Sequence, residues 1–269
     1  MSDPRAVLSS PSTISGINQL GWEEKRECYR KIIPASLHNK FNISPTWYDE
    51  EGHDLIRLNC PPGSSNVEIE VRHHKDFPDP VLYGHITDTI NGKFHILMYI
   101  INDPTSPRFD VDRLPDNTPT RLGAVYRNKS AEIAAMNFGL SPGQIRRGLR
   151  LLSSAATTFE TFISGRGHDL FFAEPLFYHN AVIFEHLGFA YQQGRKLMER
   201  IQKGFGLDGD LRRLLDSSTP FRCPEAANSI RLRSWAIQDG ILGQPFSNVT
   251  MYKRVGKFAG ISTCVNCDW

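Results

Sequence analysis

Residues 81–102 read VLYGHITDTINGKFHILMYIIN, and this stretch decides the fold. Two β-prone runs, Val81–Thr89 and Lys93–Asn102, flank Asn91-Gly92. That dipeptide strongly favours a two-residue hairpin turn, because both turn residues need positive φ. The second run is apolar on both faces from Phe94 to Ile101, which is typical of a strand in the middle of a covered sheet. The stretch therefore predicts an antiparallel hairpin at the centre of a sheet.

The residues on either side of the hairpin predict a mixed α+β protein. Val67–Val71 alternates apolar and charged side chains, as a half-buried strand does. After Ser130 the apolar period becomes helical. Ser141-Pro142 is typical of a helix start, and an apolar stripe runs from Ile145 to Ile163. We expect an N-terminal antiparallel sheet with the Asn-Gly hairpin, followed by a mainly helical C-terminal half packed on it.

The expected boundaries follow from the same patterns. Residues 1–20, rich in Ser with Pro, Thr and Gly, are expected to form a mobile arm. Residues 21–269 are expected to form a single α+β domain, β-rich over 55–125 and helical over 130–240. The smaller elements expected late in the chain are two helices and a strand, at residues 192–203, 207–216 and 249–255.

The composition excludes several classes of protein. With 40% hydrophobic and 22% charged residues, the chain is expected to fold over most of its length. Its 31 basic and 29 acidic residues leave a net charge of +2, which gives no basis for nucleic-acid binding. No apolar run reaches the ~18–20 residues of a membrane helix, and the N-terminus lacks the pattern of a secretory signal or transit peptide. Five cysteines, an odd number, favour a reducing compartment, so we expect a cytoplasmic protein.

Titratable side chains concentrate between His168 and His186, among large apolar residues. Burying such groups requires partners, and perturbed pKa values are common at functional sites. His168, Glu174 and His179 are the candidate ligands of a divalent metal, Zn or Fe, since imidazole and carboxylate suit both ions. His179 and Glu185 are the candidate catalytic residues of this region.

Helix geometry limits that site. His179 and His186 would lie two turns, about 10.5 Å, apart on one helix, too far to share an ion. A metal would therefore need ligands from outside the helix. The alternative is that these histidines are hydrogen-bonded side chains packed under an aromatic-rich helix. Cys264 and Cys267 form a CxxC without the second ligand pair of a zinc site, and we assign them no function.

Asp88 and His95 are a second candidate catalytic pair. A two-residue turn at Asn91-Gly92 would place them directly opposite each other on one face of the sheet. A carboxylate beside an imidazole fixes its tautomer and raises its basicity. The structural alternative is a cross-strand polar pair near the end of a hairpin.

Two stretches resemble GNAT-type N-acetyltransferases. Phe171–Glu174 and Asn180–Phe189 (FFAE and NAVIFEHLGF) are similar to a strand and following helix of that family, with Phe184 where many members have a tyrosine proposed as general acid. Gln144–Arg150 (QIRRGLR) partly matches the family's pyrophosphate loop, a pattern near Q/R-x-x-G-x-G/A after a strand. Arg150 replaces the last Gly or Ala, and the stretch lies inside an expected helix. The family also needs a strand after the second stretch, where this sequence reads as helix. The resemblance implies an acyl-CoA ligand.

Three function classes are open at this point. The first is a small-molecule enzyme that uses the His and carboxylate groups of residues 168–186, with or without a divalent metal. The second is an acyl-CoA-dependent N-acyltransferase-like protein. The third is a non-catalytic binding or assembly protein with Phe171–Phe189 as its interface, which would require an exposed apolar patch. A small-molecule substrate is the expected partner, and the sequence leaves the oligomeric state open, a homo-oligomer included.

Overall fold

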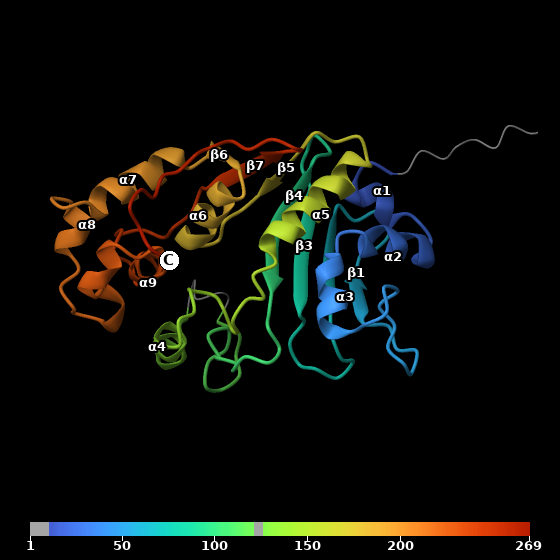
Figure 1. Cartoon of the computed structure of the whole chain (residues 1–269), viewed down its shortest axis with the longest axis horizontal. Coiled ribbons are helices and arrows are strands. Elements are labelled where there is room, and N and C mark those ends of the chain that lie inside the picture. Colours follow the sequence, from blue (N-terminus) through green and yellow to red (C-terminus); the bar gives the residue numbers. More distant parts are fainter. Residues whose placement is uncertain (1–10, 121–125) are drawn as a thin grey trace, which may run out of the picture.

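The computed structural model describes residues 11–120 and 126–269, and within them lies a seven-stranded sheet. Its strands are Ile56–Asn59 (β1), Asn66–Val71 (β2), Leu82–Asp88 (β3), Phe94–Ile101 (β4), Leu170–Ala173 (β5), Ala190–Gln193 (β6) and Thr250–Arg254 (β7). They lie in the order β1-β2-β3-β4-β5-β7-β6 (Figure 1). All neighbours are antiparallel except β4 and β5, which are parallel.

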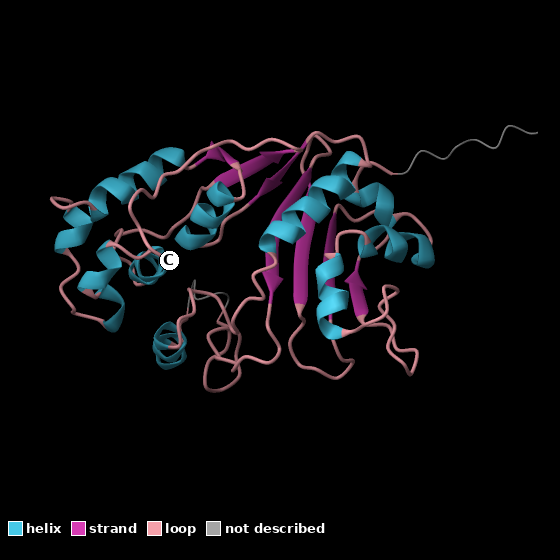
Figure 2. Cartoon of the chain, in the orientation of Figure 1, coloured by secondary structure: helices cyan, strands magenta, loops and turns pink. Residues whose placement is uncertain are grey.

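Helices pack in front of one part of this sheet and beside the other. They are Ile14–Asn18 (α1), Trp22–Arg30 (α2), Ala35–Phe41 (α3), Lys129–Asn137 (α4), Leu152–Ser164 (α5), Tyr178–His186 (α6), Arg195–Phe205 (α7), Asp210–Arg213 (α8) and Ile230–Gln238 (α9), with 3-10 helices Pro220–Arg222 (η2) and Pro224–Ala227 (η3). Figure 2 shows α1, α2, α3 and α5 together in front of β1–β4, with α6 to α9 beside β5–β7. Phe94 of β4 packs edge to face against Phe159 and Phe162 of α5.

The mixed α+β class is confirmed, and most strands are in the N-terminal half. In β2, Val67, Ile69 and Val71 are buried in the core, while Glu68 and Glu70 alternate with them at partial exposure. This is the pattern of a strand with one covered face. The same alternation in the sequence was therefore sufficient to locate the strand.

The hairpin has a different register from the expected one. β3 and β4 pair with Asp88 opposite Phe94 and Thr87 opposite His95. The connection spans residues 89–93, because the N–H of Thr89 donates to the carbonyl of Lys93 at 2.8 Å. A two-residue turn would have placed Asp88 opposite His95. The predicted pairing of these two side chains is therefore wrong.

The expected N-terminal arm is only partly described, since residues 1–10 lie outside the described residues. Residues 14–18 form α1, whose first turn is held by Asp88. The carboxylate of Asp88 accepts hydrogen bonds from the N–H of Ile14 at 2.7 Å and from the N–H of Ser15 at 2.9 Å. Ile14 and Ile17 are fully buried. This part of the segment packs into the core, and Asp88 is its anchor.

The helix expected from Ser141 begins only at Leu152. Residues 141–151 form a loop with φ of +77° at Gly143 and +59° at Arg150, values outside the α-helical region. The carbonyl of Ile145 accepts from the N–H of Phe109 at 2.8 Å instead of from its own chain four residues on. Contacts between distant segments thus override the local helical stripe.

A strand also stands where helix was expected after Phe189. β6 pairs with β7, and α7 starts only at Arg195. Gly194 lies between β6 and α7 and has a φ of +96°. A Cβ at this position would lie 2.8 Å from Val249. Only glycine fits this junction, which ends the strand and starts the helix. The late strand expected at residues 249–255 corresponds to β7.

None of the helices in residues 11–120 and 126–269 combines the length and the apolar composition of a membrane span. Near the end of the chain, Cys264 and Cys267 form a disulfide.

Candidate functional site

The parallel strands β4 and β5 separate inside the sheet. Their pairing covers only His95 with Phe172 and Ile96 with Ala173, followed by a hydrogen bond from the N–H of Glu174 to the carbonyl of Ile96 at 3.0 Å. From Leu97 onward, β4 has a described strand neighbour only on its β3 side. Figure 1 shows the two strands together at the top of the view and diverging below it. The sheet therefore contains a wedge-shaped opening.

An extra residue in β4 marks the start of this opening. The β3–β4 register passes from Ile86–Ile96 to His85–Met98, which leaves Leu97 without a partner across the ladder. Such a bulge bends its strand and increases the local twist. The bend carries the rest of β4 away from β5.

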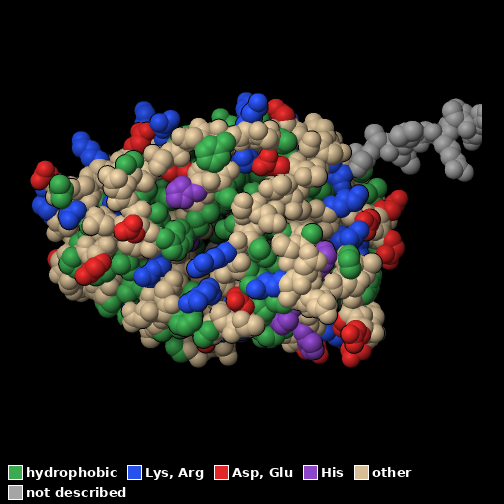
Figure 3. Space-filling view, in the orientation of Figure 1, with side chains coloured by type: hydrophobic (Ala, Val, Ile, Leu, Met, Phe, Trp, Pro, Cys, Tyr) green, Lys and Arg blue, Asp and Glu red, His purple; other side chains and the backbone are tan. Residues whose placement is uncertain are grey.

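A cavity of about 840 Å³ fills the opening. This volume lies in the range of small-molecule sites. Its walls come from β4, β5, α5, α6, the loop 139–151 and Trp269. In the space-filling view a hollow opens near the centre of the molecule, with Lys and Arg side chains along its lower rim (Figure 3). The cavity is thus largely apolar inside and basic at one edge.

The loop at this edge directly adjoins the end of β4. In sequence the two are separated by a long segment, residues 103–138, which we call the excursion. Asn102 forms a β-bridge with Gly148, and the N–H of Asp103 donates to the carbonyl of Arg147 at 2.7 Å. A Cβ on Gly148 would lie 3.4 Å from the carbonyl oxygen of Ile101, so the two backbones are in close contact. In space, the order is strand, loop and then α5.

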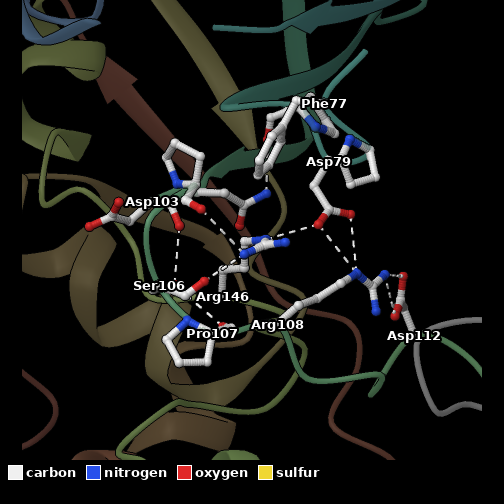
Figure 4. A network of polar contacts seen from close by, with 12 residues as sticks. Phe77, Asp79, Asp103, Ser106, Pro107, Arg108, Asp112 and Arg146 are labelled. Carbon is white, nitrogen blue, oxygen red and sulfur yellow. Dashed lines mark hydrogen bonds and ion pairs between the residues drawn. The ribbon is translucent and has the colours of Figure 1, made fainter. Parts of the chain in front are cut away.

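A buried ion pair ties the loop to the segment that precedes β3 (Figure 4). The Nε of Arg146 donates to Asp79 at 2.8 Å, and both side chains are less than 10% exposed. Arg108 lies 3.2 Å from the same carboxylate and continues to Asp112 at 2.8 Å. Arg146 also donates to the carbonyl of Ser106 at 2.5 Å. Arg146 therefore fastens the loop and does not face the cavity.

Two other arginines of this loop give the cavity a positive end. Arg147 and Arg150 line it and are exposed. α5 begins beside them, and its N-cap residue, Leu151, offers no side-chain acceptor to the first-turn N–H groups. A helix start of this kind carries partial positive charge. This end of the cavity therefore suits an anion.

Glu174 lines the cavity where the strands separate. Its Oε1 lies 3.5 Å from the Nε2 of His95, without forming a hydrogen bond. Burial lowers the pKa of His95, although the nearby Glu174 carboxylate opposes the shift. The imidazole is therefore neutral at pH 7. Two residues that the sequence assigned to different candidate sites meet here, a carboxylate open to the cavity beside a neutral imidazole.

His179 lines the cavity on the α6 side, and its tautomer can be assigned. The N–H of Phe177 donates to Oδ1 of Asn180 at 3.2 Å, which turns the Asn180 amide nitrogen toward Nε2 of His179, also at 3.2 Å. The proton of the ring is then on Nδ1, 2.9 Å from the hydroxyl of Ser234. Burial lowers the pKa of His179 to about 3. His179 is a neutral, hydrogen-bonded wall residue.

The other predicted site residues do not line the cavity. Glu185 is buried and accepts hydrogen bonds from the hydroxyls of Tyr191 at 2.5 Å and Thr263 at 2.6 Å. The Nε2 of His168 lies 2.5 Å from the carbonyl of Ser12. Both residues therefore have hydrogen-bonding partners away from the cavity.

The three candidate metal ligands His168, Glu174 and His179 do not form one cluster. Among the described residues, the ligand atoms of at least three His, Cys, Asp or Glu side chains come within 4.8 Å of one another only at Asp49, Glu51 and His53, on a surface loop. His179 has Ser234 and Asn180 as its partners, and Glu174 has His95.

Sequence reasoning missed Trp269 and Arg150 as cavity residues, whereas the acyltransferase hypothesis expected Arg146 or Arg147 near free backbone amides at a helix start, and Arg147 lines the cavity. The partial match of Gln144–Arg150 to a pyrophosphate loop was the available signal, and the expectation of a helix there obscured it. Comparisons with protein-family models, with curated proteins and with solved structures gave no significant match, so the site is interpreted from its own geometry.

Proposed function

We propose that this protein is an acyltransferase that takes an acyl group from an acyl-CoA thioester and passes it to an amine. The observation that carries the proposal is the cavity between the separated strands β4 and β5, with a basic loop and helix start at one end and Glu174 further in. Three groups of an acyl-CoA, namely the phosphates, the pantetheine arm and the thioester, each have a matching feature in this cavity.

The phosphates match the end of the cavity at Arg147 and Arg150. Both residues are exposed, with the Arg147 guanidinium over the ring of Phe138, and the start of α5 adds backbone N–H groups without a side-chain cap. Helix starts and arginines are the usual protein partners of phosphate oxygens. Arg146 is already paired with Asp79 and supports the loop that carries these two arginines.

The pantetheine arm matches the unpaired side of β4. Residues 98–101 border the cavity, and their backbone lacks a described strand partner toward β5. Pantetheine contains two amide groups, so it can hydrogen-bond to a strand edge much as a peptide strand does. Apolar side chains of α5 and α6 enclose the same space, which suits the methylene and methyl groups of the arm.

The resemblance to GNAT-type N-acetyltransferases gains support from the same features. Gln144–Arg150 follows a strand in space and precedes a helix, and a strand follows Phe189. Arg150, at the position of the expected Gly or Ala, has a φ of +59°, the left-handed conformation that glycine adopts most easily. Phe184 still lacks a hydroxyl, so this position cannot protonate the leaving thiolate.

In the proposed reaction the amine nitrogen attacks the thioester carbonyl carbon. Glu174 accepts a proton from the amine, and the neutral imidazole of His95 lies beside it, with Nε2 3.5 Å from the carboxylate. The carbon–sulfur bond then breaks, giving an amide and the thiolate of CoA, which takes up a proton to become the free thiol. Glu174 suits the role because its side chain is 42% exposed and open to the cavity.

Thermal unfolding with and without CoA tests the proposal. At a concentration of 100 times Kd, a ligand of the folded state adds about 2.7 kcal/mol, which should raise Tm by at least about 5 °C. The double variant Arg147→Ala/Arg150→Ala should lose most of that shift. Arg195→Ala, which removes an exposed arginine that does not line the cavity, is the charge control and should keep it. An unchanged Tm of the wild-type protein in saturating CoA and acetyl-CoA would refute the proposed donor.

A further inference from the structure

Three aromatic side chains line the cavity next to its basic end. Phe177 and His179 are stacked, with ring centroids 5.8 Å apart and an interplanar angle of 19°. The ring of Trp269 meets His179 edge to face at 6.3 Å. All three border the cavity. We call Phe177, His179 and Trp269 the aromatic wall.

The aromatic wall adjoins the loop that carries the arginines. A Cβ on Gly143 would lie 2.4 Å from Cε2 of Phe177, so this ring packs directly on the loop backbone. Arg147 lies further along the same loop and borders the same cavity. A ligand with phosphates at Arg147 and Arg150 would thus have the aromatic wall within reach of its next group.

The backbone just before Trp269 is held in place, while Trp269 itself is exposed. The preceding residue, Asp268, donates its N–H to the carbonyl of Asn228 at 2.8 Å and accepts from the N–H of Ile230 at 2.8 Å. The disulfide between Cys264 and Cys267 closes the turn before it. Figure 1 shows this end of the chain, marked C, beside α6 and α9. Trp269 is nevertheless 57% exposed.

The chemistry of the aromatic wall suits an uncharged planar ring. Burial keeps His179 neutral, and Phe177 and Trp269 carry no charge. Aromatic faces in a fixed position stack well on nucleobases, because every base presents a π face. A cation or a second phosphate would find no ionised partner on these three side chains.

We infer that Trp269, the exposed member of the aromatic wall, stacks on the purine ring of a nucleotide whose diphosphate lies at Arg147 and Arg150, with Phe177 and the buried His179 packed beside it. The inference rests on the proposed function and deepens it, since the acyl-CoA donor is such a nucleotide. It assigns Trp269 a binding role that affects recognition of the donor and leaves the chemistry at Glu174 untouched.

Calorimetric titration of three ligands tests the assignment: CoA, 4′-phosphopantetheine, which lacks the nucleotide, and ADP, which lacks the pantetheine arm. Loss of one stacked base should weaken binding about tenfold. Trp269→Ala should therefore bind CoA and ADP about tenfold more weakly and 4′-phosphopantetheine unchanged. Trp269→Phe should recover most of the affinity. Trp22→Ala is the matched control, because Trp22 is similarly exposed, at 49%, and does not line the cavity.

The outcomes separate this inference from the proposed function. If the wild-type protein binds CoA and Trp269→Ala binds it equally well, the purine assignment is wrong and the donor proposal stands. Tighter binding by Trp269→Ala would show that Trp269 blocks the site, and equal weakening of all three ligands would show an indirect effect on the fold. Either result overturns the inference. If the wild-type protein binds none of the three, both proposals fail.

Discussion

Lowering the pH from 8 to 5 is expected to destabilise this protein through His179, and His179→Gln should remove that part of the effect. His179 is 2% exposed, and burial lowers its pKa to about 3 from the ordinary 6.5 of the unfolded chain. Between these two values the unfolded state binds a proton that the folded state does not bind. The stability carried by neutral His179 is therefore complete above pH 6.5 and declines as the pH falls toward 3.

The size of the effect follows from these two pKa values. One proton bound only by the unfolded state changes the free energy of unfolding by about 1.4 kcal/mol per pH unit. From pH 8 to pH 5 the loss is about 2 kcal/mol, because the folded-state pKa lies well below this interval. For a chain of this size, that loss corresponds to a fall in Tm of roughly 4–8 °C. Other buried histidines add their own dependence, which the comparison of two variants cancels.

Urea unfolding of the wild-type protein and of His179→Gln at pH 8 and pH 5 measures this difference. Glutamine is uncharged at both pH values and retains a donor and an acceptor for Ser234 and Asn180. His186→Gln is the matched control, because its imidazole is exposed on the same helix. If His179→Gln keeps the full wild-type pH dependence, then His179 has the same pKa in the folded and the unfolded protein and the reasoning from its burial is wrong.

Two further predictions concern the loop and the chemistry. Asp79→Ala should lower the free energy of unfolding by about 3–5 kcal/mol, because it leaves the Arg146 guanidinium buried without its carboxylate partner. Asp110→Ala, which removes a mostly exposed carboxylate from the same network, should cost less than about 1 kcal/mol in the same urea titration. Glu174→Gln should lower kcat for release of CoA from acetyl-CoA, assayed with a panel of primary amines, by about 10²–10⁴ and leave CoA affinity unchanged. The exposed Glu199→Gln is its control, and a Glu174→Gln enzyme within threefold of wild type would exclude Glu174 as the base.

The sheet could be predicted where its signal was local. Alternation over Val67–Val71 and the apolar run Phe94–Ile101 depend on residues close in sequence, and both strands formed as expected. The parallel pairing of β4 with β5 was not predictable in the same way, because the two strands are joined by a long connection and touch over two residue pairs. The meeting of His95 and Glu174 depends on that pairing. No pattern near either residue indicates it.

The prediction of a helix from Ser141 is wrong because contacts with distant residues hold this segment in a loop. The stripe from Ile145 to Ile163 is real, but only its part after Leu152 is helical. Before that point, Arg146 gains a buried ion pair with Asp79, and the loop gains backbone bonds to residues 103–109. These interactions require a non-helical backbone with positive φ at Gly143 and Arg150. Their partners lie outside any sequence window, so local periodicity could not anticipate them.

The segment between the end of β4 and the loop 139–151 also stabilises the opening between β4 and β5. Val111 of this segment and Leu140 of the loop form a small second core with Trp235 of α9, whose indole N–H donates to the carbonyl of Leu140 at 2.8 Å. This core connects the end of β4 to the half of the molecule built on β5–β7. Between β4 and β5 themselves, only two residue pairs and the hydrogen bond from Glu174 to Ile96 join the two halves of the sheet. This segment thus links the two halves of the molecule at the wide end of the opening. The cavity can therefore stay open although β4 and β5 pair over only part of their length.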